Sequence, residues 1–469
     1  MFDLTDKVLK IASKDADYAE VRAEHISSSN LVMKNGSVES AEFSIGSGLA
    51  IRVVVDGSLG VAFVNSNDMK EIENAVNSAV SLAGKASHGM KTKANFAPEK
   101  PNRAKYEVRQ KKKVEDMSLD EKIALLKELE KSVVSQKINV PMRFFSLNDE
   151  LRHKLIVNSE GSKIESVIPK VNLFYMLTAE KNGDTEQRMN QFGSSAGYEM
   201  WDSWKIREMV PEEAKMLTTI LAKAVAPPKE KIDLVLSPEL MGIASHESCG
   251  HPYEADRIWG REGAQAGESF MEKDSIGKRI GSAAVTLVDD PTIENSYGFY
   301  LYDDDCVKAR RRVLIKNGIV NEFLHNRWTG AIWKVPSNGA ARAGTWNREP
   351  IIRMANTFVL PGDHKVDELF QGVKKGVYIK SYMEWNIDDK RFNQKYTGLE
   401  AYLIENGQLK GLVRRPKLEI TTPAFWSAVD ACAKDLKFST GNCGKNDPMD
   451  GAPVWFGGPH ARLRGIRLG

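Results

Sequence analysis

The sequence predicts an α+β protein of two domains, an N-terminal antiparallel sheet with helices (1–226) and a β-rich C-terminal domain (227–469). Three observations support this. The 469 residues are too many for one ordinary core. Strand-like runs follow one another through hairpin turns instead of alternating regularly with helices, which favours antiparallel sheets. A stretch with two prolines and several charges, 222–232, separates the two halves.

Three helices are expected in the first domain besides the one that leads to the linker. The N-terminal 24 residues read as an amphipathic helix that enters a strand. Residues 67–84 have a polar start, apolar residues at helical spacing and a terminal glycine. Residues 118–134 begin with Ser118 and Glu121 in the pattern of a capping box, which predicts a third helix.

The strands of this domain are expected between those helices. Residues 49–64 form two β-rich runs around Asp56-Gly57, which predicts a hairpin. Further extended runs occupy 140–180, whereas 88–116 is polar and aperiodic and is expected to be a long exposed loop. Pro211 is expected at the first position of a final helix that leads to the linker.

The C-terminal half is expected to be mostly β. Residues 313–323 and 402–412 are both Asn-Gly hairpins, and they share the pattern Leu-Ile-x-Asn-Gly. The shared pattern favours a common type of hairpin that occurs twice, although an internal duplication would give the same pattern. Residues 422–436 begin with Thr-Pro and are expected to form a single helix that places Cys432 in the core.

Composition and charge exclude several classes of function. The apolar fraction of 42% and the charged fraction of 28% are typical of a soluble globular protein. A net charge of +3, with short basic clusters at 109–113 and 308–312 that are expected to be solvated, gives no reason to expect nucleic acid. No signal peptide is expected, and no apolar run approaches the ~20 residues needed to cross a bilayer, so no membrane partner is expected. Four irregularly spaced cysteines favour a reducing cytoplasm.

The segment HESCGHPYEAD (246–256) holds two of the eight histidines of the chain. A strand at 232–236, a cap at Ser237 and Pro238 at the first helical position predict a helix that delivers His246 and Glu247. In a regular helix, residues five apart differ by about 140° around the axis. His246 and His251 would then point away from each other, so a regular helix cannot bring both to one ion.

The residues around the second histidine offer a remedy. Gly250 can adopt a left-handed or bulged conformation, and Pro252 disfavours the helical region for His251 and can begin a second helical segment, 252–260. A π-bulge would have the same effect. The hypothesis is therefore a helix, a break and a helix that together form a metal site. A plain helix end with chance polar residues stays open as the alternative.

A catalytic zinc site usually needs three protein ligands. Glu254 and Asp256 are close enough to bind the metal or to orient the histidines. Cys443 stands in a glycine-flanked segment that favours a plain turn but where a thiolate could approach a metal, and Lys445 could keep it deprotonated. The remaining candidate, Cys249, is expected to be packed in the core.

Taken together, these features resemble the TldD/PmbA family of metalloproteases, also called modulators of DNA gyrase, over nearly the whole chain. HESCGHPYEAD is similar to the family's H-E-x-x-x-H-x-x-E-x-D element, and GNCGK to its late Cys-Gly-Lys element. IVNSEG (156–161) and the stretch from YDDDC to LIKNG also resemble family motifs. The chain departs from the pattern in DDDC, in 383–398, which lacks a Gly-Gly, and in a shortened glycine-ended tail.

The resemblance implies a zinc ion bound by His246, His251 and Cys443, with Glu247 as the catalytic carboxylate. It also implies hydrolysis of unfolded or short peptides in an enclosed cavity. As partners it implies a homodimer or a heterodimer with a related subunit that lacks metal ligands. A non-catalytic subunit that binds peptides or a partner protein is the alternative.

Three other polar residues, His325, His460 and Ser195, are candidates for a functional role. His325 and His460 could donate to an oxyanion, but structural or surface roles are expected. GSSAG (193–197) matches the serine-hydrolase elbow with Ser195 as nucleophile. Its flanks lack the buried strand and helix that this elbow requires, so a glycine-serine loop is expected.

Overall fold

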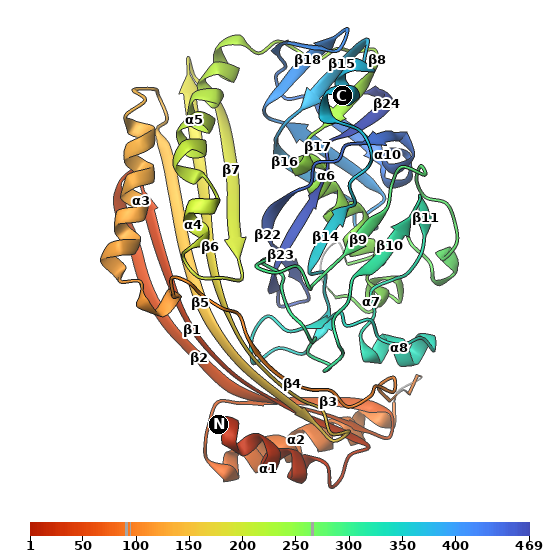
Figure 1. Ribbon diagram of the computed structural model, residues 1–469. Helices are drawn as coiled ribbons and strands as arrows, with labels where there is room; N and C mark the ends of the chain where they lie inside the picture. Colours follow the sequence, from red (N-terminus) through yellow and green to blue (C-terminus); the bar gives the residue numbers. More distant parts are fainter. Residues whose placement is uncertain (90–91, 94, 264–266) are drawn as a thin grey trace.

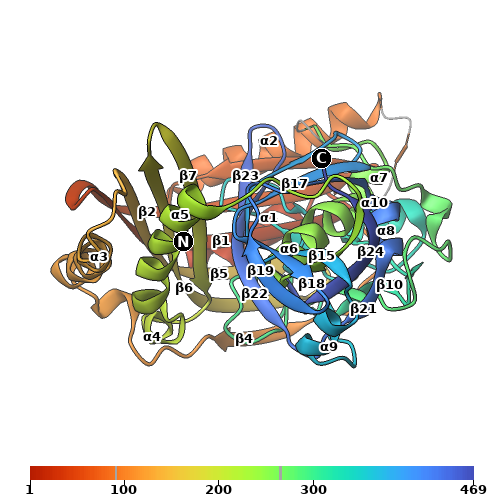
Figure 2. The same cartoon turned by 90° about the horizontal axis from the view of Figure 1, so that it is seen from above.

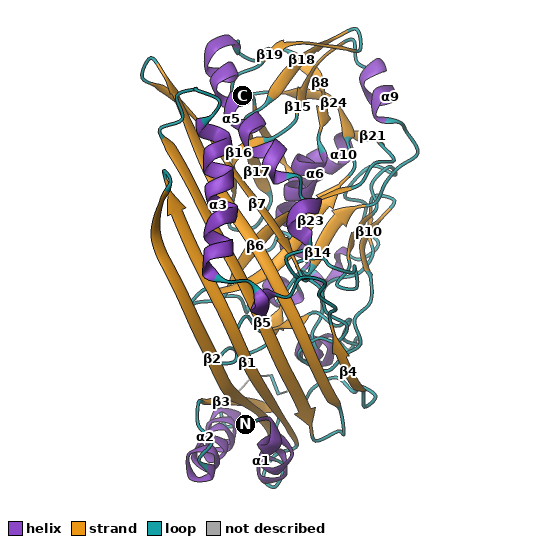
Figure 3. Ribbon diagram, turned by 60° about the vertical axis from the view of Figure 1, so that its left-hand side comes forward, coloured by secondary structure: helices purple, strands orange, loops and turns teal. Residues whose placement is uncertain are grey.

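A computed structural model describes residues 1–89, 92–93, 95–263 and 267–469. Long strands curve along one side of the molecule, and the C-terminal half lies against their concave side (Figure 1). Coloured by secondary structure, the same arrangement shows sheets and helices in both halves (Figure 3). The α+β class is therefore confirmed. The division into domains at 226/227 stays a prediction. No helix in the described part of the chain combines the length and low polarity that crossing a bilayer requires.

The N-terminal half is built on one twisted sheet of seven strands in the order β3-β2-β1-β5-β6-β4, with β7 also paired to β6. All pairs are antiparallel except the parallel pair of β4 and β6. The strands are β1 (Tyr18–Lys34), β2 (Ser37–Val55), β3 (Ser58–Val64), β4 (Arg103–Glu107), β5 (Met142–Asn158), β6 (Lys163–Lys181) and β7 (Asp184–Ser194). The hairpin at Asp56-Gly57 is confirmed, since Val55 pairs with Ser58.

Helices cover two regions of this sheet. At one end lie α1 (Thr5–Ala12) and α2 (Met69–Ser87), and at the other end lie α3 (Leu119–Val134), α4 (Met200–Ser203) and α5 (Ile206–Lys223) (Figure 1). Short 3-10 turns η1 (Phe2–Leu4) and η2 (Val114–Asp116) precede α1 and α3. The capping box is confirmed, because Glu121 N–H donates to the Ser118 hydroxyl and the Glu121 carboxylate accepts from Ser118 N–H.

Two expectations for this half were wrong. Pro211 does not begin its helix, because α5 starts at Ile206, directly after Lys205 reverses the chain with a left-handed backbone (φ 52°). Pro211 then gives up one helical hydrogen bond. The stretch 88–116 is not all loop, because its residues 103–107 pair with β6 as strand β4. Positions 90, 91 and 94 of that stretch lie outside the described residues.

The C-terminal half contains two six-stranded sheets, in the orders β11-β10-β9-β14-β23-β22 and β19-β18-β15-β8-β24-β21. Smaller sheets join β16-β17-β20 and β12-β13. The strands are β8 (Lys231–Leu236), β9 (Leu287–Asp289), β10 (Arg312–Lys316), β11 (Ile319–Val320), β12 (Ala341–Arg342), β13 (Ile351–Ile352), β14 (Asn356–Val359), β15 (Lys375–Ile379), β16 (Tyr382–Ile387), β17 (Asn393–Gly398), β18 (Ala401–Glu405), β19 (Gln408–Leu412), β20 (Lys417–Thr421), β21 (Val429–Cys432), β22 (Lys437–Lys445), β23 (Asp450–Gly458) and β24 (Ala461–Arg467).

Short helices connect and fill these sheets. They are α6 (Pro238–Ser245), α7 (Ala255–Ile258), α8 (Arg327–Trp333), α9 (Val366–Gln371), α10 (Thr422–Ala428) and the 3-10 turn η5 (Lys273–Ser275). Helix α6 contacts β14, β22 and β23, and it lies among the C-terminal strands when the molecule is seen from above (Figure 2). The main apolar cluster of this half surrounds α6 and includes Leu240, Met241 and Ile243. The helix that leads to the candidate site is therefore held on several sides.

The Asn-Gly hairpins are confirmed as β10–β11 and β18–β19. The single helix over 422–436 was wrong, because α10 ends at Ala428 and the chain continues as β21, paired with β24. Pairing with a neighbouring strand thus overrides the helical pattern, while Cys432 is buried as expected. In the basic cluster 308–312, Arg312 is buried and paired with Asp289 rather than solvated.

Candidate metal centre

The helix before the histidines forms as its sequence predicts. The Ser237 hydroxyl accepts a hydrogen bond from Leu240 N–H, Pro238 occupies the first turn of α6, and Glu239 stands near the positive end of the helix dipole. Every residue of α6 except Glu239 is buried. This burial fixes the direction in which the helix delivers His246.

After Ser245 the chain continues as a π-helical turn, η3 (His246–Gly250). His251 N–H donates to His246 C=O, so the turn contains one residue more than an α-helical turn. The two imidazoles therefore lie on the same side, with ring centroids 4.8 Å apart. The π-bulge alternative is confirmed, and the left-handed conformation for Gly250 was wrong, since its φ is −54°.

Glycine is needed at position 250 because of a close approach, not because of its φ angle. A Cβ atom built there would lie 1.8 Å from the sulfur of Met354, which is fully buried. Pro252 then lies in the 3-10 turn η4 (His251–Tyr253), and Glu254 adopts an extended backbone before α7 begins. The expected second helical segment over 252–260 is thus a 3-10 turn and a short α-helix.

Cys443 reaches the two histidines from strand β22. It was expected in a plain turn, but it pairs with Ala452 of β23 within a regular antiparallel ladder. The Cys443 Sγ atom lies 3.4 Å from His251 Nε2. One candidate ligand atom from each of His246, His251 and Cys443 lies within 4.8 Å of the other two, and all three side chains are buried. The structure therefore brings together the three residues that the sequence analysis singled out.

These residues fit a zinc ion on two grounds. Imidazole and thiolate are both ligands that zinc takes, and three protein ligands are the number at zinc sites that keep an open position. Within the described residues, the buried His246 Nδ1 has no hydrogen-bond partner. A buried polar nitrogen without a partner is costly unless something binds it, and a metal ion would do so.

Glu254 orients one of the candidate ligands. Its Oε2 atom accepts from His251 Nδ1 at 3.0 Å and from Arg257 Nε at 2.6 Å. Burial alone would raise the pKa of Glu254, but Lys445 and Arg257 hold it well below its usual range. The carboxylate is therefore charged and fixes the imidazole with Nε2 toward Cys443, as orienting partners of metal ligands do.

Lys445 does not act on the Cys443 sulfur, contrary to the expectation. Its Nζ atom donates to both oxygens of Asp256 at 2.8 Å and to Ile352 C=O at 2.8 Å. Alternate residues of a strand share a face, so Lys445 lies beside Cys443 but reaches past it to the end of the HESCGHPYEAD segment. Arg353 instead donates to the Cys443 carbonyl oxygen. Lys445 thus ties β22 to the segment that carries the histidines.

The protonation states suit metal binding. Burial lowers the pKa of both imidazoles, that of His251 to about 4, which favours their neutral forms. Burial acts to raise the pKa of the Cys443 thiol, but His251 and Arg353 outweigh it and lower that pKa to about 7. A thiol with this pKa gives up its proton to a metal near neutral pH.

Glu247 follows the first histidine inside the π-helical turn and is also buried. Its Oε2 atom pairs with the guanidinium of Arg391, which comes from the turn between β16 and β17. No local sequence pattern points to Arg391. It lies 144 positions from Glu247, and the only signal was its place in the divergent stretch 383–398.

The other candidates have structural surroundings. The His325 ring contacts the Thr329 hydroxyl at 3.1 Å, and the His460 ring bridges Asp435 and Tyr378. Ser195 is fully buried and donates to a backbone carbonyl. The expected packing of Cys249 is confirmed, because it belongs to the main apolar cluster.

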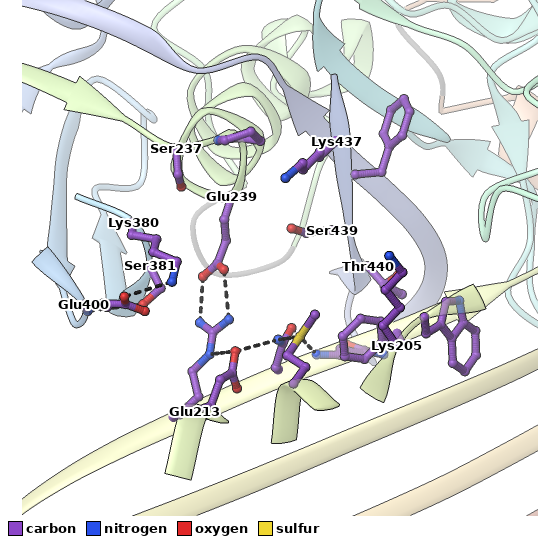
Figure 4. A pocket seen from close by; sticks show the side chains of 18 of the residues that line it. Lys205, Glu213, Ser237, Glu239, Lys380, Ser381, Glu400, Lys437, Ser439 and Thr440 are labelled. Atoms are coloured by element: carbon purple, nitrogen blue, oxygen red, sulfur yellow. Dashed lines mark hydrogen bonds and ion pairs between the residues drawn. The ribbon is translucent and has the colours of Figure 1, made fainter. Parts of the chain in front are cut away.

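A cavity of about 780 Å³ lies between β7 and α5 on one side and the C-terminal half on the other. Glu239 projects into it from α6, and Ser439 and Thr440 line it from β22 (Figure 4). Arg188 of β7 pairs with the carboxylates of both Glu239 and Glu213. Thr440, which lines the cavity, and Cys443 belong to the same strand, β22.

Comparisons with known proteins agree with this arrangement. Three family models match the chain: PmbA/TldA metallopeptidase domain 1 over residues 19–83, the central domain over 112–222 and the C-terminal domain over 229–469. A metalloprotease of Methanocaldococcus jannaschii is 31% identical over 97% of this chain and 96% of its own. A zinc metalloprotease TldD homolog of Saccharolobus solfataricus is 25% identical over 98% of both chains.

Solved structures show the same fold. A proposed modulator of a DNA gyrase from Thermotoga maritima superposes with a TM-score of 0.80 at 16% identity, over 100% of this chain and 99% of that one. TldE from Thermococcus kodakarensis superposes with a TM-score of 0.75 at 17% identity, over 99% of both chains. The architecture is thus shared along the full length of these relatives.

Proposed function

The chain belongs to the TldD/PmbA family of metallopeptidases, and from this membership and the geometry of the site we propose that it is a zinc-dependent peptidase that hydrolyses unfolded or short peptides. The observation that carries the proposal is the buried cluster of His246, His251 and Cys443 with Glu247 in the same turn. The alternative, a non-catalytic subunit that binds peptides or a partner, is less favoured because both histidines and the carboxylate are present.

In this proposal His246, His251 and Cys443 hold the zinc ion. Bound zinc supplies Lewis acidity, polarising the scissile carbonyl and making water acidic enough to act as a nucleophile near neutral pH. Glu247 accepts the proton of the attacking water and passes it to the leaving amine. Glu254 keeps His251 in place, as its 3.0 Å contact supports. The thiolate reduces the net positive charge on zinc and moderates its acidity.

The cavity supports a peptide as the substrate. Strand β22 is the last strand of its sheet, and Ser439 and Thr440 of this strand line the cavity. An extended peptide can bind such an edge through main-chain hydrogen bonds, with little preference for side chains. A folded protein would first have to offer an extended segment, which favours unfolded or short substrates.

We also propose that the protein works in the cytoplasm and as a dimer, either of two copies or with a related subunit that lacks the metal ligands. Four free cysteines support a reducing compartment. Family resemblance is what supports the dimer. Direct contact with nucleic acid is not proposed, because the net charge of +3 provides no strong basic surface.

The decisive experiment combines metal content with cleavage. Zinc per chain is measured in purified protein, and cleavage of an unstructured fluorogenic peptide is compared between the wild type and Glu247→Gln. Glu322→Gln, which alters an acidic residue away from the cluster, is the control for substitution as such. About one zinc per chain and loss of cleavage only in Glu247→Gln support the proposal. Metal-free protein that cleaves equally in both variants would refute it.

A further inference from the structure

The buried guanidinium of Arg391 lies beside the candidate metal centre, where the proposed mechanism above assigns it no role. It pairs with Glu247 Oε2, and its positive charge acts to lower the pKa of both His246 and His251, although burial has the larger effect on both and the neighbouring anionic groups act in the opposite direction. Arg391 is 7% exposed. A permanent cation therefore lies within electrostatic range of both imidazoles and directly on the proposed catalytic carboxylate.

The backbone around Arg391 is arranged to direct this side chain inward. Arg391 has a left-handed backbone conformation (φ 64°), which is unfavourable for a residue with a side chain. Its N–H donates to Asp388 C=O, and its C=O accepts from the Thr422 hydroxyl at 2.8 Å. The Asp388 carboxylate also accepts from Phe392 N–H and Asn393 N–H. The turn is thus held by its own polar contacts and does not need the guanidinium.

A purely structural role explains this pair poorly. Burying two charges costs desolvation energy, and a buried ion pair seldom stabilises a fold more than apolar residues of similar size. The other cations of the site contact groups behind the ligands: Arg257 binds Glu254, Lys445 binds Asp256 and Arg353 binds the Cys443 carbonyl. Among the described residues, Arg391 is the cation that pairs with Glu247.

We propose that Arg391 is a catalytic residue that binds the carbonyl oxygen of the scissile peptide bond and stabilises the negative charge that develops on it. This inference rests on the proposed peptidase function and deepens it. A guanidinium has five N–H donors and is always charged, so it can contact Glu247 and a carbonyl oxygen together. Fixed donors at a developing oxyanion are among the largest contributions to catalysis.

The reaction balances with these residues. Water attacks the carbonyl carbon, its proton goes to Glu247, and the electron pair of the C=O bond moves onto the oxygen that faces Arg391. When that pair returns, the C–N bond breaks and the proton on Glu247 goes to the leaving nitrogen. Because Arg391 and Glu247 are already paired, the acceptor of the proton and the donor to the oxyanion are in place before the substrate enters.

The test compares Arg391→Ala and Arg391→Lys with the wild type. Arg52→Lys is the matched control, because Arg52 is also buried and ion-paired but lies on β2 of the N-terminal sheet. Three quantities are measured in zinc-loaded protein: zinc content, kcat/KM for a fluorogenic peptide, and the dissociation constant of a phosphonamidate analogue of that peptide, whose tetrahedral anion mimics the transition state. Binding of the intact peptide is measured in the Glu247→Gln background with and without Arg391→Ala.

We expect Arg391→Ala to keep its zinc, to lose about 100-fold in kcat/KM and to bind the analogue weaker by a similar factor. Binding of the intact peptide should change less than about threefold, because the oxyanion is absent from it. Arg391→Lys should lie in between, and millimolar guanidinium should partly restore Arg391→Ala. A merely structural residue would show neither the selective loss of analogue binding nor the rescue.

Other results would overturn the inference. An Arg391→Ala variant that cleaves as well as the wild type or faster shows that Arg391 is dispensable or obstructive. Equal weakening of analogue and intact peptide shows a general binding role. A wild-type protein that binds the analogue and the intact peptide but cleaves no peptide would refute the proposed function itself. That outcome is distinct from the two results above, which concern only the Arg391→Ala variant. Thermal unfolding of the metal-free proteins shows whether Arg391→Ala is folded. If it is not, the same measurements on Arg391→Lys decide whether the inference holds.

Discussion

His246 and His251 are five residues apart, yet their rings lie 4.8 Å apart, because a single π-helical turn adds one residue between them. The hydrogen bond from His251 N–H to His246 C=O closes this turn. The local backbone, rather than a long-range fold contact, therefore decides whether two nitrogen donors can converge.

The first prediction concerns the space that this turn needs. Gly250→Ala should weaken zinc binding at least tenfold, because the new methyl group would overlap the Met354 sulfur and displace the turn. Zinc affinity is measured by competition with a chelator. Met354→Ala added to Gly250→Ala should recover much of the affinity by making room. Gly84→Ala, whose new methyl group meets nothing within 4 Å, is the control. Unchanged affinity in Gly250→Ala would show that the turn tolerates a side chain.

A second prediction concerns the carboxylate behind His251. Glu254→Gln should lower zinc affinity roughly 10- to 100-fold, since orienting partners of metal ligands contribute about this much. It should also lower the melting temperature of the metal-free protein, because Arg257 and Lys445 lose their shared anion. Exposed Glu368→Gln serves as the reference. Wild-type zinc affinity in a folded Glu254→Gln protein would show that His251 needs no such partner.

Much of this site is predictable from sequence, because it is local. Ser237 and Pro238 mark the helix start, and the five-residue spacing of the histidines requires a departure from a regular α-helix, which the π-helical turn supplies, although Pro252 does not keep His251 out of the helical region (φ −59°). What could not be predicted depends on tertiary contacts. Position 250 must be glycine because the Met354 side chain packs directly against it. Lys445 donates to Asp256 across the site instead of acting on Cys443.

The fold shows the same division. Capping and hairpin residues act within a few positions, so the Ser118 cap and the Asn-Gly hairpins were predicted correctly. Cys443 was expected in a turn because glycines flank it, but pairing with β23 makes this segment a strand. The Arg391 contact with Glu247 joins positions 144 residues apart, and no local pattern encodes it.

A third prediction concerns acid stability. Burial alone would raise the pKa of Asp304, but Lys154 and Arg22 lower it to about 2. Because this is below the unfolded value, the group contributes stability that is complete above about pH 4 and is lost as the pH falls toward 2. Comparing urea unfolding at pH 6 and pH 3, we expect the loss on acidification to be smaller in Asp304→Asn than in the wild type, by about 1 kcal/mol.

Asp304→Asn itself should be less stable than the wild type at pH 6, since it leaves the half-buried Lys154 without its anion. Asp274→Asn, at an exposed pair with Lys278, should show a much smaller pH-dependent difference, because solvent screens this pair. An identical loss in Asp304→Asn and the wild type would mean that this carboxyl does not titrate in the window between pH 4 and 2.

The most direct test of the account is zinc X-ray absorption spectroscopy of the purified protein. The proposed centre predicts two nitrogen scatterers at about 2.0–2.1 Å and one sulfur scatterer at about 2.3 Å, with the sulfur lost in Cys443→Ser. A spectrum without sulfur in the wild type, or one that Cys443→Ser leaves unchanged, would contradict the convergence of His246, His251 and Cys443 on one ion.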